Sequence, residues 1–140
     1  MKIALAIDGS RRSLRAARFL IELIKGREGT EVHVLNVQPP VRYAELLPVK
    51  KRRLAKQWYR DGGENETAAA RVLLASANVP SDLHIVAGDP ATSIVTLARE
   101  LKCDLIVMGT RGMSKVAGLV LGSVANKVIH LADAPVTLVK

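Results

Sequence analysis

The segment of the sequence best suited to bind a ligand carries a pattern of three widely spaced glycines and a serine. The segment reads Gly109-Thr110-Arg111-Gly112, then nine residues, then Gly122-Ser123. Gly109 and Gly112 would let backbone N–H groups approach an anion closely. Gly122-Ser123 opens a predicted helix whose free N–H groups and positive dipole end suit a phosphate. The alternative is a loop whose glycines serve turns only, but the pattern favours a phosphate site.

A second candidate group, Asp8-Gly9-Ser10, directly follows the first apolar run of the chain. Asp8 could hold a divalent cation through water once a phosphate ligand is bound, because magnesium favours one carboxylate together with phosphates. Equally, Asp8 could serve only to cap the adjoining turn. Arg111 and Lys115 could neutralise phosphate charge.

Other phosphate-binding and catalytic patterns are missing from the sequence. It has no G-x-x-x-x-G-K-S/T loop, and no G-x-G-x-x-G follows the first predicted strand, which argues against a P-loop NTPase and the usual dinucleotide fold. His33, His84 and His130 are scattered, so no metal site made of protein ligands alone is expected. Ser10 and Ser123 lack a base visible in the sequence. No catalytic residue is therefore assigned.

Strands and helices alternate along the chain and position these residues. Apolar runs predict strands at 3–7, 31–37, 83–86, 105–108 and 136–139, and periodic segments predict helices at 13–25, 64–78, from 90 onward, and at 123–131. Ser10 and Asp89 are predicted helix N-caps, and Gly62-Gly63 is expected to interrupt a basic stretch before the helix at 64–78.

Strands that are apolar on both faces predict a parallel sheet covered by helices on both sides. Ligands of such sheets bind beyond the carboxyl ends of the strands, which would bring Asp8, Val37 and Gly109 to one crevice. We expect a single α/β domain over residues 1–140.

Composition limits the class of protein. The chain has 140 residues, 49% hydrophobic and only 3% aromatic, which suits one domain with an aliphatic core. A single cysteine, Cys103, suits a reducing compartment. Met1-Lys2 precedes only five apolar residues, too few for a signal peptide, and no uncharged run is long enough to span a membrane. A cytoplasmic protein without membrane contact is expected.

The net charge of +8 lies in one part of the chain. Residues 1–60 hold 14 Lys and Arg against 5 Asp and Glu, whereas residues 61–140 hold 7 against 8. The excess falls on residues 11–18 and 50–60, where Trp58 and Tyr59 are expected to be tucked beneath a solvated helix face. The alternative function is an interaction or adaptor module whose basic face docks an acidic protein or a nucleic acid. Direct stacking of a nucleic acid on Trp58 and Tyr59 is less favoured than a solvated helix face.

The glycine segment matches the G-x-x-G-(nine residues)-G-S/T signature of the universal stress protein family. Asp8-Gly9-Ser10 is similar to the first-loop motif of that family, and Ala134-Pro135-Val136 resembles its closing strand. The resemblance runs from Lys2 to Lys140. It implies an open five-stranded parallel sheet in the order 3-2-1-4-5, a Rossmann-like fold that binds adenine nucleotide, and a homodimer.

The resemblance also implies a role for individual residues. Members with this glycine signature typically bind ATP, so ATP or another adenine nucleotide is the expected ligand, with Mg²⁺ as a candidate companion and at most slow ATP hydrolysis. Ala6, Ile7 and Asp8 would lie at the adenine side of the first loop, although many relatives carry proline where this chain has Ala6. Val37 would pack on the adenine or ribose. Met108 and Gly109 would line the floor, and the phosphates would be held by Gly112, Gly122, Ser123 and Val124.

The expected function is that of a small cytosolic, nucleotide-responsive stress factor. The expected dimer forms through the last strand, 136–139, whose apolar residues at a sheet edge invite pairing with a second copy.

Overall fold

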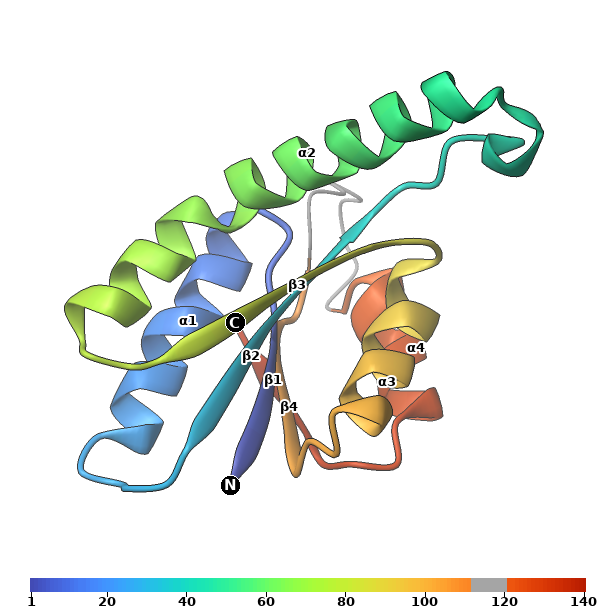
Figure 1. Ribbon diagram of the computed structural model, residues 1–140. Coiled ribbons are helices and arrows are strands. Elements are labelled where there is room, and N and C mark those ends of the chain that lie inside the picture. The colour runs from blue at the N-terminus through green and yellow to red at the C-terminus, as the bar shows by residue number, and fades with distance from the viewer. Residues whose placement is uncertain (112–120) are drawn as a thin grey trace.

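A computed structural model describes residues 1–111 and 121–140 of the chain (Figure 1). Its elements follow in the order β1 (Lys2–Ala6), α1 (Arg11–Ile24), β2 (Glu31–Gln38), η1 (Ala44–Leu46), α2 (Val49–Ser76), β3 (Ser81–Ala87), α3 (Pro90–Glu100), β4 (Leu105–Gly109), α4 (Ser123–Leu131) and β5 (Val136–Val139). Every predicted strand and helix is present, and most ends are shifted by only a few residues; the exception is α2, which begins at Val49 and not near residue 64. None of the helices within the described ranges is long and apolar enough to cross a membrane.

The five strands form one parallel sheet in the order β3-β2-β1-β4-β5, which confirms the predicted topology. The register pairs Leu5 of β1 with Val34 of β2 and with Val107 of β4. β1 therefore lies at the centre of the sheet, and β3 and β5 are its edges.

Helices cover both faces of the sheet, and each face has its own core (Figure 1). On one face α1 and α2 pack against alternate strand residues, and the fully buried ones include Ile3, Leu5 and Val34. On the other face α3 and α4 pack against the intervening residues, among them Ala4, Leu35 and Ile106. Burying one large aliphatic side chain stabilises the fold by about 1.5–3 kcal/mol, so two aliphatic layers suffice without aromatic residues.

The two predicted N-caps are confirmed. Ser10 has an extended backbone, and its hydroxyl accepts a hydrogen bond from the N–H of Ser13 at 3.1 Å. Asp89 accepts one from the N–H of Thr92 at 3.0 Å, with Pro90 as the first residue of α3. Each cap satisfies one of the N–H groups that a helix start leaves without a partner.

The expected break at Gly62-Gly63 is wrong, because α2 runs without interruption for 28 residues from Val49 to Ser76. A Cβ on Gly63 would lie 2.7 Å from three carbons of Ile85, and one on Gly62 would lie 2.6 Å from Oε1 of Gln38. The glycines therefore let the helix approach β2 and β3 closely. The stabilisation from this close packing outweighs the low helix propensity of glycine.

Candidate functional site

Three apolar side chains predicted to contact a nucleotide lie on the same face of the sheet, near the carboxyl ends of neighbouring strands. Ala6 ends β1, Met108 is the penultimate residue of β4, and Val37 is the penultimate residue of β2. All three pack with the core on the α3–α4 face, where Ala6 and Met108 are buried and Val37 is partly exposed. The structure thus brings them together as the apolar floor of one edge. Ile7, by contrast, belongs to the core on the α1–α2 face.

The first loop is held in place by its own hydrogen bonds. Oδ1 of Asp8 accepts a hydrogen bond from the N–H of Ser10 at 3.0 Å, and Gly9 has φ of +80°, a left-handed conformation that favours glycine. The Asp8 carboxylate therefore has a structural role as a turn acceptor. Its second oxygen has no hydrogen bond within the described part of the chain.

A buried polar network, which the sequence reasoning missed, fixes the start of this loop from behind. Nδ2 of Asn36 donates to the carbonyl of Ile7 at 2.9 Å and to Oε2 of Glu66 at 2.8 Å. Nε2 of Gln38 donates to Oδ1 of Asn36 at 2.8 Å and to Oε2 of Glu66 at 3.0 Å. Glu66 also packs its aliphatic stem against Gly9. A carboxylate on α2 thereby ties β2 to the backbone just before Asp8.

The end of β4 and the start of α4 lie side by side, joined by backbone hydrogen bonds. The N–H of Thr110 donates to the carbonyl of Val139 at 3.0 Å, and the N–H of Gly122 donates to the carbonyl of Thr110 at 2.7 Å. Gly122 is the N-cap of α4 and gives the helix no side-chain cap. The first-turn amides of Ser123 and Val124 are thus placed at this edge with the positive end of the helix dipole.

Close packing against α1 requires a glycine at position 109, a requirement that the sequence did not reveal. A Cβ at this position would lie 2.9 Å from the Cβ of Arg12 and 3.1 Å from the backbone nitrogen of Ser13. The missing side chain therefore lets β4 approach the first turn of α1. The backbone of Gly109 remains at the predicted edge, but the side toward α1 is filled.

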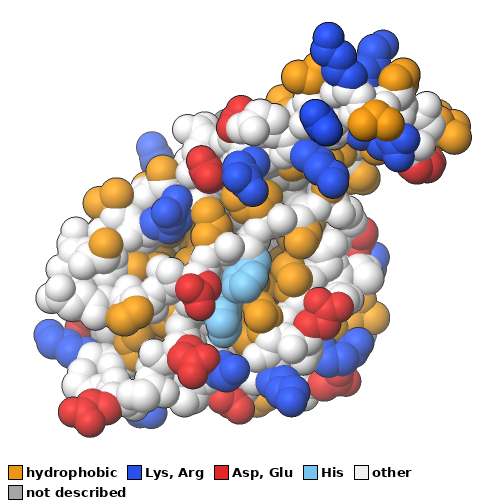
Figure 2. Space-filling model, in the orientation of Figure 1, with side chains coloured by type: hydrophobic (Ala, Val, Ile, Leu, Met, Phe, Trp, Pro, Cys, Tyr) orange, Lys and Arg blue, Asp and Glu red, His pale blue; other side chains and the backbone are white. Residues whose placement is uncertain are grey.

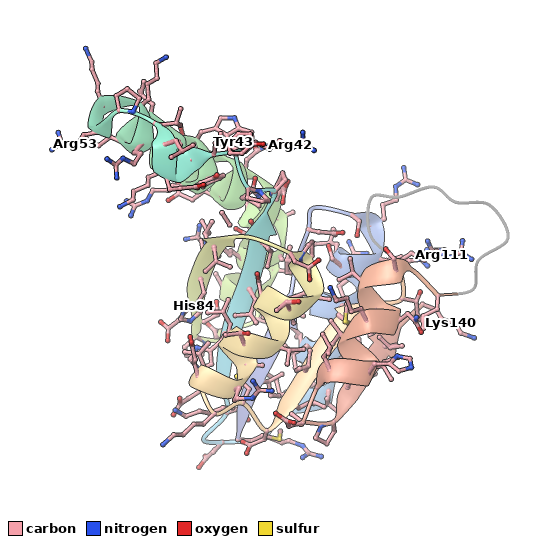
Figure 3. The ribbon with its side chains drawn as sticks, turned by 90° about the vertical axis from the view of Figure 1, so that its right-hand side faces the viewer. Arg42, Tyr43, Arg53, His84, Arg111 and Lys140 are labelled. Carbon is pink, nitrogen blue, oxygen red and sulfur yellow. The ribbon has the colours of Figure 1, made fainter. Side chains whose placement is uncertain are left out.

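Arg111 stands beside α4 at the same edge (Figure 3), and its Nε is buried without a hydrogen-bond partner among the described residues. A buried donor of this kind favours an anionic acceptor. Two other predicted residues, Gly112 and Lys115, lie outside the described residues.

Comparison with known proteins supplies the family. The model of the universal stress protein family matches residues 1–140, the whole chain. The chain belongs to the universal stress protein family. Universal stress protein MJ0531 of Methanocaldococcus jannaschii is 34% identical over 141 residues, covering 99% of this chain and 81% of that protein.

Solved universal stress proteins share the fold. The structure of MJ0577 from the same organism superposes with a TM-score of 0.84 at 27% identity, covering 99% of this chain and 94% of that one. The universal stress protein of Archaeoglobus fulgidus in complex with dAMP superposes with a TM-score of 0.69 at 26% identity, covering 100% and 98%. The resemblance stated from the glycine segment is therefore confirmed at the level of family and fold.

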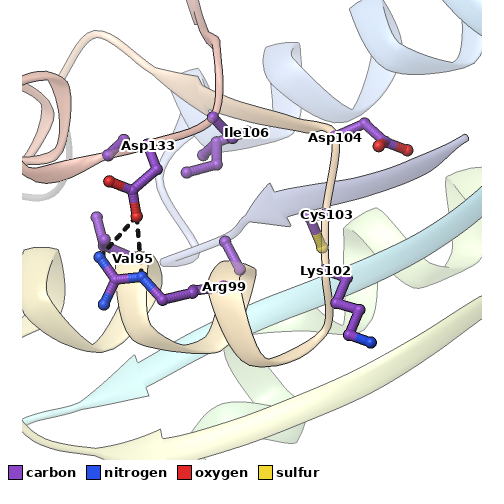
Figure 4. A pocket seen from close by; sticks show the side chains of 10 residues that line it. Val95, Arg99, Lys102, Cys103, Asp104, Ile106 and Asp133 are labelled. Carbon is purple, nitrogen blue, oxygen red and sulfur yellow. Dashed lines mark hydrogen bonds and ion pairs between the residues drawn. The ribbon is translucent and has the colours of Figure 1, made fainter.

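The opposite edge of this universal stress protein has a hollow of about 320 Å³ at the amino ends of β4 and β5 (Figure 4). Cys103 lines it, and Arg99 closes one side through an ion pair with Asp133 at 2.8 Å. Burial raises the pKa of the Cys103 thiol, and the neighbouring Asp104 raises it further. The thiol therefore stays protonated at neutral pH, which disfavours a reactive role.

Two of the three histidines meet across neighbouring strands, a contact that their sequence positions did not suggest. Nδ1 of His33 and Nε2 of His84 are 3.1 Å apart, and Oδ2 of Asp82 lies 4.0 Å from His33. Burial lowers the pKa of His84, and the nearby His33 lowers it further, while Asp82 opposes both effects. In the described part of this universal stress protein no three His, Cys, Asp or Glu side chains form a group that could hold a metal ion.

Proposed function

We propose that this universal stress protein binds an adenine nucleotide at the carboxyl edge of its sheet and responds to stress through that ligand. One observation carries the proposal: the apolar floor of Ala6, Val37 and Met108 shares this edge with the uncapped amino end of α4. A flat, apolar purine and a phosphate need these two surfaces together. The dAMP complex of the Archaeoglobus fulgidus relative supports the same class of ligand.

In this proposal the two ends of the nucleotide meet different chemistry. The base and ribose pack on Ala6, Val37 and Met108, with the backbone at Ile7 and Gly109 beside them. The phosphates accept hydrogen bonds from the amides of Ser123 and Val124 and from Arg111. Gly122, whose own amide donates to Thr110, lets the phosphates approach because it has no side chain, and Gly112 completes the loop. Asp8 holds a nucleotide-bound Mg²⁺ through water when the ligand is ATP.

The proposal concerns binding and does not include a catalytic step. Sequence reasoning assigns no general base, and Asp8 already accepts a hydrogen bond from its own loop. We propose a cytoplasmic homodimer, with β5 as the contact. β5 is an edge strand with four partly buried residues, Val136–Val139, and its open ladder is a template for a second copy.

A charge placed at the amino end of α4 tests the site. We expect Ser123→Asp to weaken AMP binding at least tenfold by calorimetry, because the carboxylate competes with the phosphate for the same amides. The same change should preserve or raise the melting temperature, since an acidic residue stabilises a helix N-terminus. Ser123→Asn is the matched neutral control and should bind far better than Ser123→Asp.

Weaker AMP binding together with an unchanged or higher melting temperature shows that the substitution removes the site and does not damage the fold. A Ser123→Asp variant that melts normally and binds AMP as tightly as the unsubstituted protein would contradict the proposed phosphate position. Mass spectrometry of the denatured protein should also identify a co-purified adenine nucleotide, and this shows which phosphorylation state is bound.

A further inference from the structure

Residues 41–60 form an arm that extends beyond the sheet. After β2 the chain turns outward through η1 and returns along the first half of α2, which projects past the other elements (Figure 1). Tyr59 holds the two halves together, because its hydroxyl accepts a hydrogen bond from the N–H of Val41 at 2.6 Å. The arm is therefore an ordered part of the structure, and its tip lies near residues 46–50.

The arm carries most of the net charge of the protein. It holds seven Lys and Arg against Glu45 alone, a balance of +6 within a chain of net charge +8. All seven are exposed, and none forms an ion pair with another described residue. They are Arg42, Lys50, Lys51, Arg52, Arg53, Lys56 and Arg60.

The same arm exposes large apolar side chains. Six of the eleven exposed large hydrophobic residues in the described chain belong to it, including Leu46 at 75%, Leu54 at 65% and Trp58 at 54% exposure. The expectation that Trp58 is tucked beneath the helix is therefore wrong. Figure 2 shows the apolar and basic side chains mixed on the projecting upper right of the molecule, and Figure 3 shows Arg42, Tyr43 and Arg53 standing clear of the sheet. Exposed apolar groups gathered in this way mark a contact surface.

The combination of side chains discriminates between partners. A nucleic acid would take the cations and stack on aromatic rings, but it offers no partner for aliphatic Leu46, Val49 and Leu54. A second arm would meet this one with like charge. An anionic bilayer surface can bind the basic, aliphatic and aromatic side chains together. The acidic headgroups attract the cations, the aliphatic tip inserts at the acyl boundary, and Trp and Tyr lie at the level of the headgroups.

We propose that the arm docks on an anionic lipid surface, with the apolar tip inserted and the basic residues around it on the headgroups. Such a peripheral contact needs no membrane-spanning helix, and the body of the protein remains outside the bilayer. The proposal therefore replaces the expectation from the sequence that the protein makes no membrane contact. The proposal does not depend on nucleotide binding, which uses other residues.

The single tryptophan makes the test direct, because fluorescence from Trp58 reports on the arm alone. Vesicles of phosphatidylcholine mixed with phosphatidylglycerol should shift the emission to the blue and co-sediment the protein. Vesicles of phosphatidylcholine alone should do neither, and raised salt should reverse the binding. No shift with anionic vesicles, or an equal shift with neutral ones, would overturn the proposal.

Paired charge reversals show whether vesicle binding depends on the arm in particular or on the positive charge of the whole protein. Arg52→Glu with Arg53→Glu should lower the vesicle affinity more than about 25-fold, since each cation near an anionic surface contributes about fivefold. Arg15→Glu with Arg18→Glu makes the same charge change on exposed positions of α1 and should have a far smaller effect. Equal losses from both pairs would contradict a specific role for the arm.

Two soluble polyanions test the competing partners. At equal salt, oligo-dT and polyglutamate should each bind more weakly than the anionic vesicles and leave the Trp58 emission nearly unshifted. Leu46→Gln with Leu54→Gln should abolish the blue shift with vesicles while sparing any binding to oligo-dT. Tighter binding to either polyanion than to the vesicles would overturn the lipid proposal in favour of a nucleic acid or an acidic protein.

Discussion

Gly63→Ala is expected to destabilise the protein, although alanine is the better helix former. Gly63 is buried in the middle of α2, opposite Ile85 of β3. A Cβ there would lie 2.7 Å from Cδ1, Cγ1 and Cγ2 of Ile85, well inside van der Waals contact. Either the helix must move off the sheet or the isoleucine must leave its position.

The magnitude follows from two opposing terms. Alanine in place of glycine inside a helix stabilises by roughly 0.5–1 kcal/mol. Overpacking a filled core costs about 1–3 kcal/mol. The contact involves three carbons of one side chain together, so we place the cost in the upper part of this range. The expected net loss in the free energy of unfolding is on the order of 1–2 kcal/mol.

Urea unfolding followed by circular dichroism measures this loss, and Ile85→Ala provides the matched background. That substitution removes all three contacting carbons, so Gly63→Ala should then stabilise by roughly 0.5–1 kcal/mol through helix propensity alone. The sign of the effect should reverse between the two backgrounds, a coupling that only touching residues show. Stabilisation by Gly63→Ala in the unsubstituted protein, or the same effect in both backgrounds, would refute the close-approach explanation.

Three further predictions concern the polar groups. Asn36→Leu should lower the free energy of unfolding by about 1–3 kcal/mol in urea and weaken AMP binding, because Ile7 and Glu66 lose their donor; unchanged stability would show that the network does not hold the loop. The pKa of Asp89 is lowered from its ordinary value of 3.8 to about 2, first by the hydrogen bond from the N–H of Thr92 and then by Lys127. Its stabilising effect should therefore be complete above pH 4 and fade as the pH falls toward 2, so the melting temperatures of the protein and of Asp89→Asn should converge in acid. Burial lowers the pKa of His84 below 6.5, so the folded protein binds fewer protons there than the unfolded chain and should lose stability as the pH falls below 6.5; His84→Gln should weaken this dependence, and an NMR titration of the imidazole showing a pKa above 6.5 would contradict it.

Local signals were sufficient for most of the fold. Ser10 and Asp89 identify helix starts because a cap depends on residues only three positions apart. The apolar runs identify buried parallel strands because both faces of such a sheet are covered by helices. The order of the strands came from the family resemblance, because the alternation of elements alone allows other orders.

The features that sequence reasoning missed all depend on contacts between distant segments. Gly63 is recognised as a packing glycine only when the distance from α2 to Ile85 is known, and the register of β2 and β3 is what brings His33 to His84. Asn36 and Gln38 did leave a signal, since they are two polar residues at alternate positions on the face of β2 that also carries Val32 and Val34. Their partner Glu66 lies about 30 residues away on a helix and could not be named.

Amide chemical shifts of the 15N-labelled protein during titration with AMP test the central claim most directly. The proposal predicts saturable changes at the carboxyl edge, largest for Ile7, Asp8, Val37, Gly109, Ser123 and Val124, with residues around Cys103 at the opposite edge unaffected. Changes confined to the amino-edge hollow, or no changes at millimolar AMP, would contradict the proposed nucleotide site.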